Sequence, residues 1–221
     1  MRINEVITES LDEAILDEWS TMDYGVIEAL KKKGYKFLGK GVDQAAFREP
    51  GTGHVLKIFG TQGRQDFSKD HRMFFKWADY CQHHQDNEFL PRFYGHESFI
   101  WSREPEYKFQ HVPKPARYLM IRTEPLRDSG EVGNWVSSLA SYVNKNRDLG
   151  RAMELFDTDK SNSQPLYNHL GSTERIHRLA ETIYDLNKFG RAYRWGWDLH
   201  HGNIMLRRDG TPVLNDPWVV D

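Results

Sequence analysis

Strand-like and helix-like segments follow one another in blocks along this chain, and that order constrains its fold more than any other feature. Between residues 35 and 60, three short apolar runs are separated by turns containing glycine or proline, which predicts a three-stranded antiparallel meander. Residues 64–85 carry apolar side chains at helical spacing and predict one long helix. Two further strands are expected at 90–95 and 118–122. This part of the chain therefore predicts a five-stranded antiparallel sheet interrupted by one helix.

The other segments are mostly helical in pattern. Apolar residues that recur every three or four positions predict helices at 10–19, 22–33, 131–145, 147–156 and 173–189. Gly190 is expected to end the last helix, residues 161–165 to form a break before it, and the proline-containing stretch 98–117 to form a loop. Strand-like residues 203–206 and 212–215 predict a hairpin. The expected fold class is α+β.

Size and charge narrow the range of partners. With 221 residues the chain can bury one good core or build two small lobes. A formal net charge of -2 gives no bias toward nucleic acid or an anionic membrane. The single cysteine, Cys81, cannot form an internal disulfide, and no apolar run approaches the roughly 20 residues that span a bilayer. The sequence thus predicts a cytoplasmic protein without a nucleic-acid or membrane partner.

The segment Asp-Leu-His-His-Gly-Asn, which begins at Asp198 and ends at Asn203, carries the clearest chemistry. Asp216 follows it, directly after the expected hairpin. Carboxylate and amide oxygens suit Mg²⁺, and a separate carboxylate can accept the proton of a hydroxyl group. Aspartate and asparagine in turns are usually structural when they occur alone, so it is their combination that predicts a phosphoryl-transfer site. His200 and His201 are expected to serve loop structure or acceptor contact rather than zinc, because no third ligand stands at a zinc-like spacing.

This segment resembles the catalytic loop of the protein-kinase-like superfamily, especially its atypical, aminoglycoside-phosphotransferase-like branch. The resemblance implies that Asp198 is the catalytic base, that Asn203 and Asp216 bind magnesium, and that ATP is the phosphoryl donor. It also implies a bilobal protein-kinase-like fold. The expected parts are a helical extension at 1–34, an N-lobe at 35–124 with the five-stranded sheet and one long helix, and a reduced, mostly helical C-lobe at 125–221.

The first half of the chain agrees with this resemblance. Gly39, Lys40 and Gly41 resemble the glycine-rich loop that holds ATP phosphates, although Gln44 replaces the third glycine of the family pattern. Lys57, in Val-Leu-Lys-Ile, resembles the lysine that contacts the α- and β-phosphates. A charge in such an apolar strand is costly without a partner, so Lys57 is assigned to both catalysis and nucleotide binding.

Two parts of the expected nucleotide site are less defined. Kinases pair the lysine with a glutamate on the next helix, but residues 64–85 contain none. Asp70 is the expected partner and Asp66 the second candidate, although aspartates also favour the first turns of any helix. The strand 118–122 resembles the one that leads to the adenine-binding hinge. The expected adenine-contacting residues are Ile121, Arg122, Thr123 and Glu124.

The resemblance covers residues 35–218 and leaves no room for an activation segment or for the helices that bind peptides, so a standard protein kinase is not expected. Three alternatives stay open. Residues 131–167 build a site for a small-molecule or protein acceptor; a protein partner or a second copy completes the lobe; or the chain is a pseudokinase that modulates a partner without turnover. Transfer of the nucleotide itself is a further alternative. The first ten residues resemble the openings of some tailed-phage proteins, which implies location in a host cytoplasm.

Overall fold

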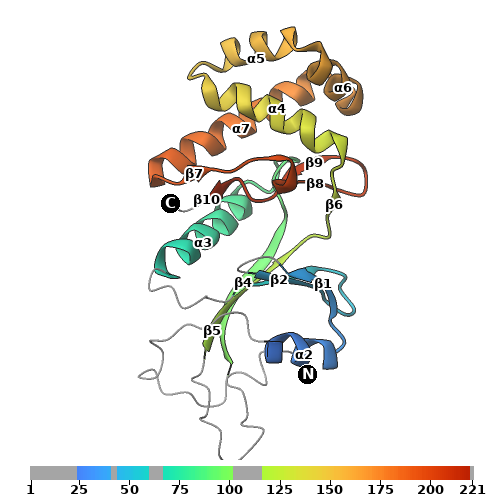
Figure 1. Cartoon of the computed structure of the whole chain (residues 1–221), viewed down its shortest axis with the longest axis vertical. Coiled ribbons are helices and arrows are strands. Elements are labelled where there is room, and N and C mark those ends of the chain that lie inside the picture. Colours follow the sequence, from blue (N-terminus) through green and yellow to red (C-terminus); the bar gives the residue numbers. More distant parts are fainter. Residues whose placement is uncertain (1–23, 41–43, 60–66, 102–115, 220–221) are drawn as a thin grey trace, which may run out of the picture. The chain divides into compact units, whose positions relative to one another are not determined.

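The computed structural model describes residues 24–40, 44–59, 67–101 and 116–219 (Figure 1). They form two compact units. The first comprises the chain up to Tyr80 together with Arg92–Pro125, and the second comprises Cys81–Pro91 and the chain from Leu126 onward. The expected α+β class is confirmed, whereas the bilobal kinase-like arrangement stays a prediction. Among the described helices, none is long and apolar enough to cross a membrane.

The first unit contains the five-stranded antiparallel sheet that the sequence predicts. Its strands are β1 (Lys36–Lys40), β2 (Gln44–Arg48), β3 (Val55–Phe59), β4 (Phe93–Trp101) and β5 (Ala116–Thr123). Their order in the sheet is β1-β2-β3-β5-β4, and every neighbouring pair is antiparallel.

The loop expected at 98–117 is wrong at both ends. Residues from Ser98 to Trp101 pair with residues from Leu119 back to Ala116, so β4 and β5 extend well past their predicted limits. Phe99 and Trp101 favour a pleated strand, and this preference is stronger than the loop signal of the charged residues around them. The prolines lie in 102–115, outside the described residues.

The helix α2 (Tyr24–Lys32) packs on one face of this sheet. Ile27 and Leu30 of the helix form a core with apolar residues of the strands, namely Ala45, Phe47, Leu56, Ile58 and Met120. The helix predicted at 22–33 is thereby confirmed over its described residues, whereas the helix predicted at 10–19 lies outside them. The helix α2 ends at Lys32, and Gly34 follows it with a φ of 86°, a left-handed conformation that glycine adopts without strain.

The long helix predicted at 64–85 is α3 (Phe67–His83). Met73, Trp77 and Ala78 are buried, and the Trp77 ring lies edge-on to Phe93 of β4 with 6.4 Å between ring centroids. Phe93 pairs with Thr123, which lies two positions from Ile121 on β5 and so on the same face of the strand. Met120, which belongs to the α2 core, lies on the other face. Side chains alternate between the faces of a strand, so α3 contacts the face opposite α2.

Four helices build most of the second unit: α4 (Glu131–Lys145), α5 (Leu149–Thr158), α6 (Lys160–Leu170) and α7 (Thr173–Tyr193). The long pair, α4 and α7, carries fully buried residues such as Val136, Leu139 and Ile183. An amide hydrogen bond, from Asn187 Nδ2 to Asn144 Oδ1 at 2.6 Å, connects the same two helices. The helices predicted at 131–145, 147–156 and 173–189 are therefore present.

Two predicted helix boundaries, at residues 161–165 and at Gly190, differ from the structure. The break expected at 161–165 is wrong, because these residues belong to α6 with Pro165 inside the helix. Pro165 removes one helical hydrogen bond, but burial of Leu166 and Leu170 favours the helix nonetheless. The stop expected at Gly190 is also wrong: α7 continues to Tyr193 and ends at Arg194, which has a φ of 60°.

Two small sheets complete the second unit. The predicted hairpin is present as β8 (Ile204–Leu206) and β9 (Pro212–Leu214), and β6 (Arg127–Asp128) adds to its edge. The second sheet pairs β7 (Gly196–Trp197) with β10 (Trp218–Val219). These two-residue strands were not predicted, because two residues are too short to show a period.

Candidate functional site

The loop that follows β7 has a fixed backbone. The N–H of Asp198 donates to the carbonyl of Pro217 at 2.9 Å, that of His200 to the carbonyl of Asp198 at 2.9 Å, and that of Asn203 to the carbonyl of His200 at 2.9 Å. The loop closes in a single 3₁₀ turn, His201–Asn203, and Leu199 anchors it by burying its side chain to 5 % exposure. Its conformation is thus defined by local hydrogen bonds and one apolar contact.

Asp216 is brought to this loop by a hydrogen bond on each side. The preceding residue, Asn215, donates its N–H to the carbonyl of Asn203 at 2.9 Å. The following residue, Pro217, accepts the N–H of Asp198. The second unit therefore brings together the three residues that the sequence assigns to base and metal binding, Asp198, Asn203 and Asp216.

The Asn203 amide connects the loop ends through its side chain. Its Nδ2 donates to the Asp198 carbonyl at 2.8 Å and to the Asp198 Oδ2 at 3.1 Å. With the NH₂ group used in this way, Oδ1 is the Asn203 atom left to bind a cation. The Asp198 side chain remains 44 % exposed and accessible to an acceptor.

The described residues contain no group of three or more His, Cys, Asp or Glu side chains placed to hold a metal ion. The pair of oxygen donors from Asn203 and Asp216 instead fits Mg²⁺, which keeps several waters and takes phosphate oxygens as its other ligands.

His200 has a defined orientation beside Asp198. Its Nδ1 accepts the N–H of Gly202 at 3.1 Å, so the proton of the neutral ring is on Nε2, which lies 4.0 Å from Asp198 Oδ2. Gly202 permits this arrangement, since a Cβ there would lie 2.8 Å from His200 Cε1. His200 thus supports the loop, as the sequence suggested, and points an N–H group toward the proposed base.

An aromatic cluster holds β10 in place beside Asp216. Trp218 packs against Phe189 at 5.4 Å and against Trp195 at 5.3 Å between ring centroids. Its indole also fills the space over Gly190, where any Cβ would collide with Nε1 and lie 2.7 Å from Cδ1. Trp195 and Trp218 therefore serve packing, and the role of Gly190 is close contact rather than helix termination.

In the first unit, three of the expected nucleotide-binding positions lie on one row across the sheet. Gly39 pairs with Ala46, Ala46 with Lys57, and Lys57 with Ile121. Paired residues of an antiparallel sheet point to the same face, so Gly39, Lys57 and Ile121 share the face opposite α2. Lys57 is half-buried and Ile121 is 1 % exposed. The strand register thus groups these three residues on one face of the sheet.

The expected glycine-rich loop is shorter than predicted. Gly39 and Lys40 belong to β1 and Gln44 begins β2, whereas Gly41 lies outside the described residues. Pairing along β1 shifts by one residue between Phe37 and Gly39, a bulge that no periodicity in the sequence indicates. A Cβ at Gly39 would meet nothing within 4 Å, so the backbone there is open to close approach. The side chain of Lys40 is not among the described ones.

The expected partners of Lys57 remain predictions. Asp70 lies in α3, but its side chain is outside the described part of the structure, and Asp66 lies outside it altogether. The helix itself contacts the sheet face that carries Lys57, through Trp77 and Phe93.

The strand that carries the expected adenine-contacting residues ends later than predicted, because β5 continues through Thr123. Arg122 lies on the α2 face, where its Nε is 3.1 Å from Glu49 Oε1, so its side chain is separated from the Lys57 row. Thr123 is buried on the Lys57 face. Glu124 donates its N–H to the Arg92 carbonyl at 3.0 Å and accepts the Arg92 N–H at 2.9 Å. Its backbone N–H is therefore already used within the protein.

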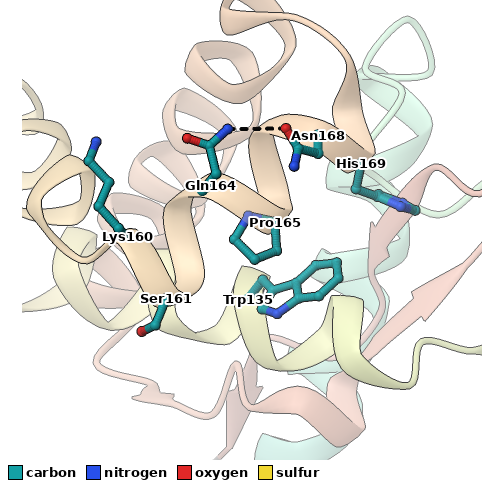
Figure 2. Close-up of a pocket in the computed structure, with 7 residues that line it drawn as sticks. All are labelled: Trp135, Lys160, Ser161, Gln164, Pro165, Asn168 and His169. Carbon is teal, nitrogen blue, oxygen red and sulfur yellow. Dashed lines mark hydrogen bonds between the residues drawn. The ribbon is translucent and has the colours of Figure 1, made fainter.

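A shallow groove of about 600 Å³ lies between α4 and α6 (Figure 2). The indole of Trp135 and the ring of Pro165 form its apolar centre, and Gln164 Nε2 donates to Asn168 Oδ1 at 3.1 Å along its rim. Trp135 is two positions from Gly133, which faces the Asp198 loop at His201, and two positions correspond to roughly 200° around a helix. The groove and the loop are therefore on different sides of α4.

No protein-family model and no curated protein matches this sequence. Inference about its chemistry consequently depends on the motif and on the geometry described above.

Proposed function

We propose that the protein is a magnesium-dependent phosphotransferase that moves the γ-phosphoryl group of ATP to a hydroxyl acceptor. The observation that carries the proposal is the convergence of Asp198, Asn203 and Asp216, because the loop and the segment after β9 are joined by backbone hydrogen bonds on both sides of Asp216. These residue types supply one base and two oxygen ligands, which is what phosphoryl transfer requires.

Each residue has a role in this reaction. Asn203 Oδ1 and the Asp216 carboxylate would hold Mg²⁺, whose charge offsets that of the phosphate oxygens. Asp198 orients the acceptor hydroxyl and takes its proton as the new O–P bond forms and ADP departs. Lys57 neutralises phosphate charge, and Gly39 lets the β1 backbone approach the phosphates.

The proposal assigns both Lys57 and Asp216 to nucleotide binding. The row of Gly39, Lys57 and Ile121 on one sheet face supports the role of Lys57. The backbone hydrogen bonds around Asp216 support its role beside the Asp198 loop. Substitution of Lys57 and substitution of Asp216 must then each weaken ATP binding.

Product analysis tests the type of reaction without a known acceptor, because water acts as a slow acceptor in many phosphotransferase sites. The protein is incubated with ATP and Mg²⁺, and the products are separated by ion exchange. We expect ADP and phosphate at a rate that Asp198→Asn reduces strongly and that Asp185→Asn, an exposed control on α7, leaves unchanged. Release of AMP with pyrophosphate would instead indicate nucleotidyl transfer. ATP binding without any product would favour the pseudokinase alternative.

A further inference from the structure

The start of α4 lies directly against the catalytic loop. Ser129 is a polar residue at only 5 % exposure, and its Oγ donates to the carbonyl of His201 at 3.4 Å. Gly133, one helical turn later, has no room for a side chain: a Cβ would collide with Ser129 Oγ and lie 3.1 Å from the His201 carbonyl oxygen. Ser129 and Gly133 thus form a notch that holds the middle of the loop.

The notch is fixed to the strand that leaves the loop. Asp128 of β6 pairs with Met205 of β8, and its Oδ1 accepts the N–H of Gly130 at 2.8 Å. Gly130 has a φ of 52°, a left-handed conformation that turns the chain from β6 into α4. The first turn of α4 and the end of the loop are therefore parts of one hydrogen-bonded structure.

The His201 carbonyl links this notch to the proposed chemistry. It accepts both the Ser129 hydroxyl and the N–H of Ile204, which ends the 3₁₀ turn. Asn203, inside that turn, donates to the backbone and side chain of Asp198. A shift of the His201 carbonyl therefore moves the amide that orients Asp198.

We infer that Ser129 and Gly133 are positioning residues that fix the geometry of the Asp198 loop from α4. The inference rests on the proposed function for its effect on turnover, but its structural part concerns the loop alone. The proposed reaction assigns neither residue a contact with ATP, Mg²⁺ or the acceptor. They act through the His201 carbonyl and Asn203.

The test compares Gly133→Ala, Ser129→Ala and the double variant, with Gly150→Ala as a matched control. Gly150 is also near a helix start, but a Cβ there would meet only Asp148 Oδ1, at 3.3 Å. Replacing Gly133 alone forces the new methyl group against Ser129 Oγ, whereas the double variant lacks that atom. The double variant should therefore be less disturbed than Gly133→Ala, which a nonspecific defect in the helix would not produce.

Two readouts separate the inference from the proposed function. Hydrogen exchange of the loop amides measures loop order, and ADP release measures turnover. We expect Gly133→Ala to speed exchange of the Asn203 amide and to lower ADP release, each by about tenfold, and the double variant to recover about threefold of both, as expected for neighbouring residues that couple. Ser129→Ala should speed loop exchange and lower ADP release by a few-fold. This variant tests the inference even if Gly133→Ala fails to fold.

The two claims can fail separately. If Gly133→Ala alters loop exchange and the double variant restores it, but the protein shows no turnover, the positioning role is supported and the proposed function is rejected. The positioning role would be overturned by a different result. In that result the unsubstituted protein turns over normally, and every Ser129 and Gly133 variant shows the same loop exchange and ADP release as Gly150→Ala.

Discussion

Gly190→Ala is the substitution for which the structure and simple helix propensity give opposite expectations. Alanine is favoured over glycine inside a helix by about 0.5–1 kcal/mol, and Gly190 lies in the last turn of α7, which ends at Tyr193. The structure, however, places the Trp218 indole over this position, so the added methyl group would collide with Nε1 and lie 2.7 Å from Cδ1. The two effects can be weighed against each other.

The collision outweighs the propensity gain because the indole cannot move alone. Trp218 is 4 % exposed and packs against Phe189 and Trp195 within 5.4 Å and 5.3 Å of their ring centroids. Overpacking of this kind costs about 1–3 kcal/mol and the propensity gain offsets about 0.5–1 kcal/mol, so we expect a net destabilisation of up to about 2.5 kcal/mol. For a protein of this length, that corresponds to a decrease of up to roughly 10 °C in the unfolding midpoint.

Thermal and urea unfolding of Gly190→Ala measure this effect, with Gly150→Ala as the control in which a methyl group has more space. The control should keep or slightly raise the midpoint. Combining Gly190→Ala with Trp218→Leu should cost less than the two single changes added together, because the colliding ring is then absent. If Gly190→Ala raises the midpoint as Gly150→Ala does, the packing of Trp218 on α7 is refuted.

Other changes test separate contacts. Asp198→Asn should lower ADP release by about 10²–10⁴-fold while ATP affinity changes little, since only the base is lost; equal losses in both would assign Asp198 to binding. Asn203→Ala removes a donor to two Asp198 oxygens and should cost about 1–2 kcal/mol in urea unfolding, whereas an unchanged midpoint contradicts that role. Burial raises the pKa of Glu49, but hydrogen bonds from Thr52 and Arg122 outweigh it and leave the pKa below its ordinary 4.5. Its ionised form therefore stabilises the fold above that pH, and this contribution is lost as pH falls. Glu49→Gln should reduce the unfolding midpoint at pH 7 and flatten its decline below about pH 5; an identical pH profile argues against this.

Much of the secondary structure could be predicted, because the spacing of apolar residues along a segment reflects which of its side chains are buried. The presence of the five strands and of α4 follows from runs of apolar residues at regular spacing, and the limits of α4 match the prediction. Glycine and proline were less reliable. Gly190 signals a helix end by composition, yet its function is to admit a ring from a strand 28 residues later. Pro165 signals a break, yet burial of Leu166 and Leu170 keeps the helix intact.

In the candidate site, too, some features follow from local sequence and others depend on distant contacts. Asp198, Asn203 and Asp216 could be proposed from spacing, because a loop and a hairpin of fixed length bring them together. The bulge that sets the position of Gly39 depends on pairing with β2 and leaves no periodic signal. Ser129 contacts a residue 72 positions away, so no local pattern could connect it to the loop. Contacts of that range are known only once the chain is folded.

The central claim is that the protein binds Mg²⁺-ATP and that Lys57 and Asp216 are among the residues that bind it, and isothermal titration of ATP with and without Mg²⁺ tests this most directly. Four variants are compared with the unsubstituted protein: Lys57→Ala, Asp216→Ala and the exposed controls Lys36→Ala and Asp185→Ala. We predict Mg²⁺-dependent binding that both site variants weaken by about tenfold or more, about 1.4 kcal/mol, and that neither control changes. ATP binding that is absent, independent of Mg²⁺, or insensitive to Lys57→Ala and Asp216→Ala would contradict the account.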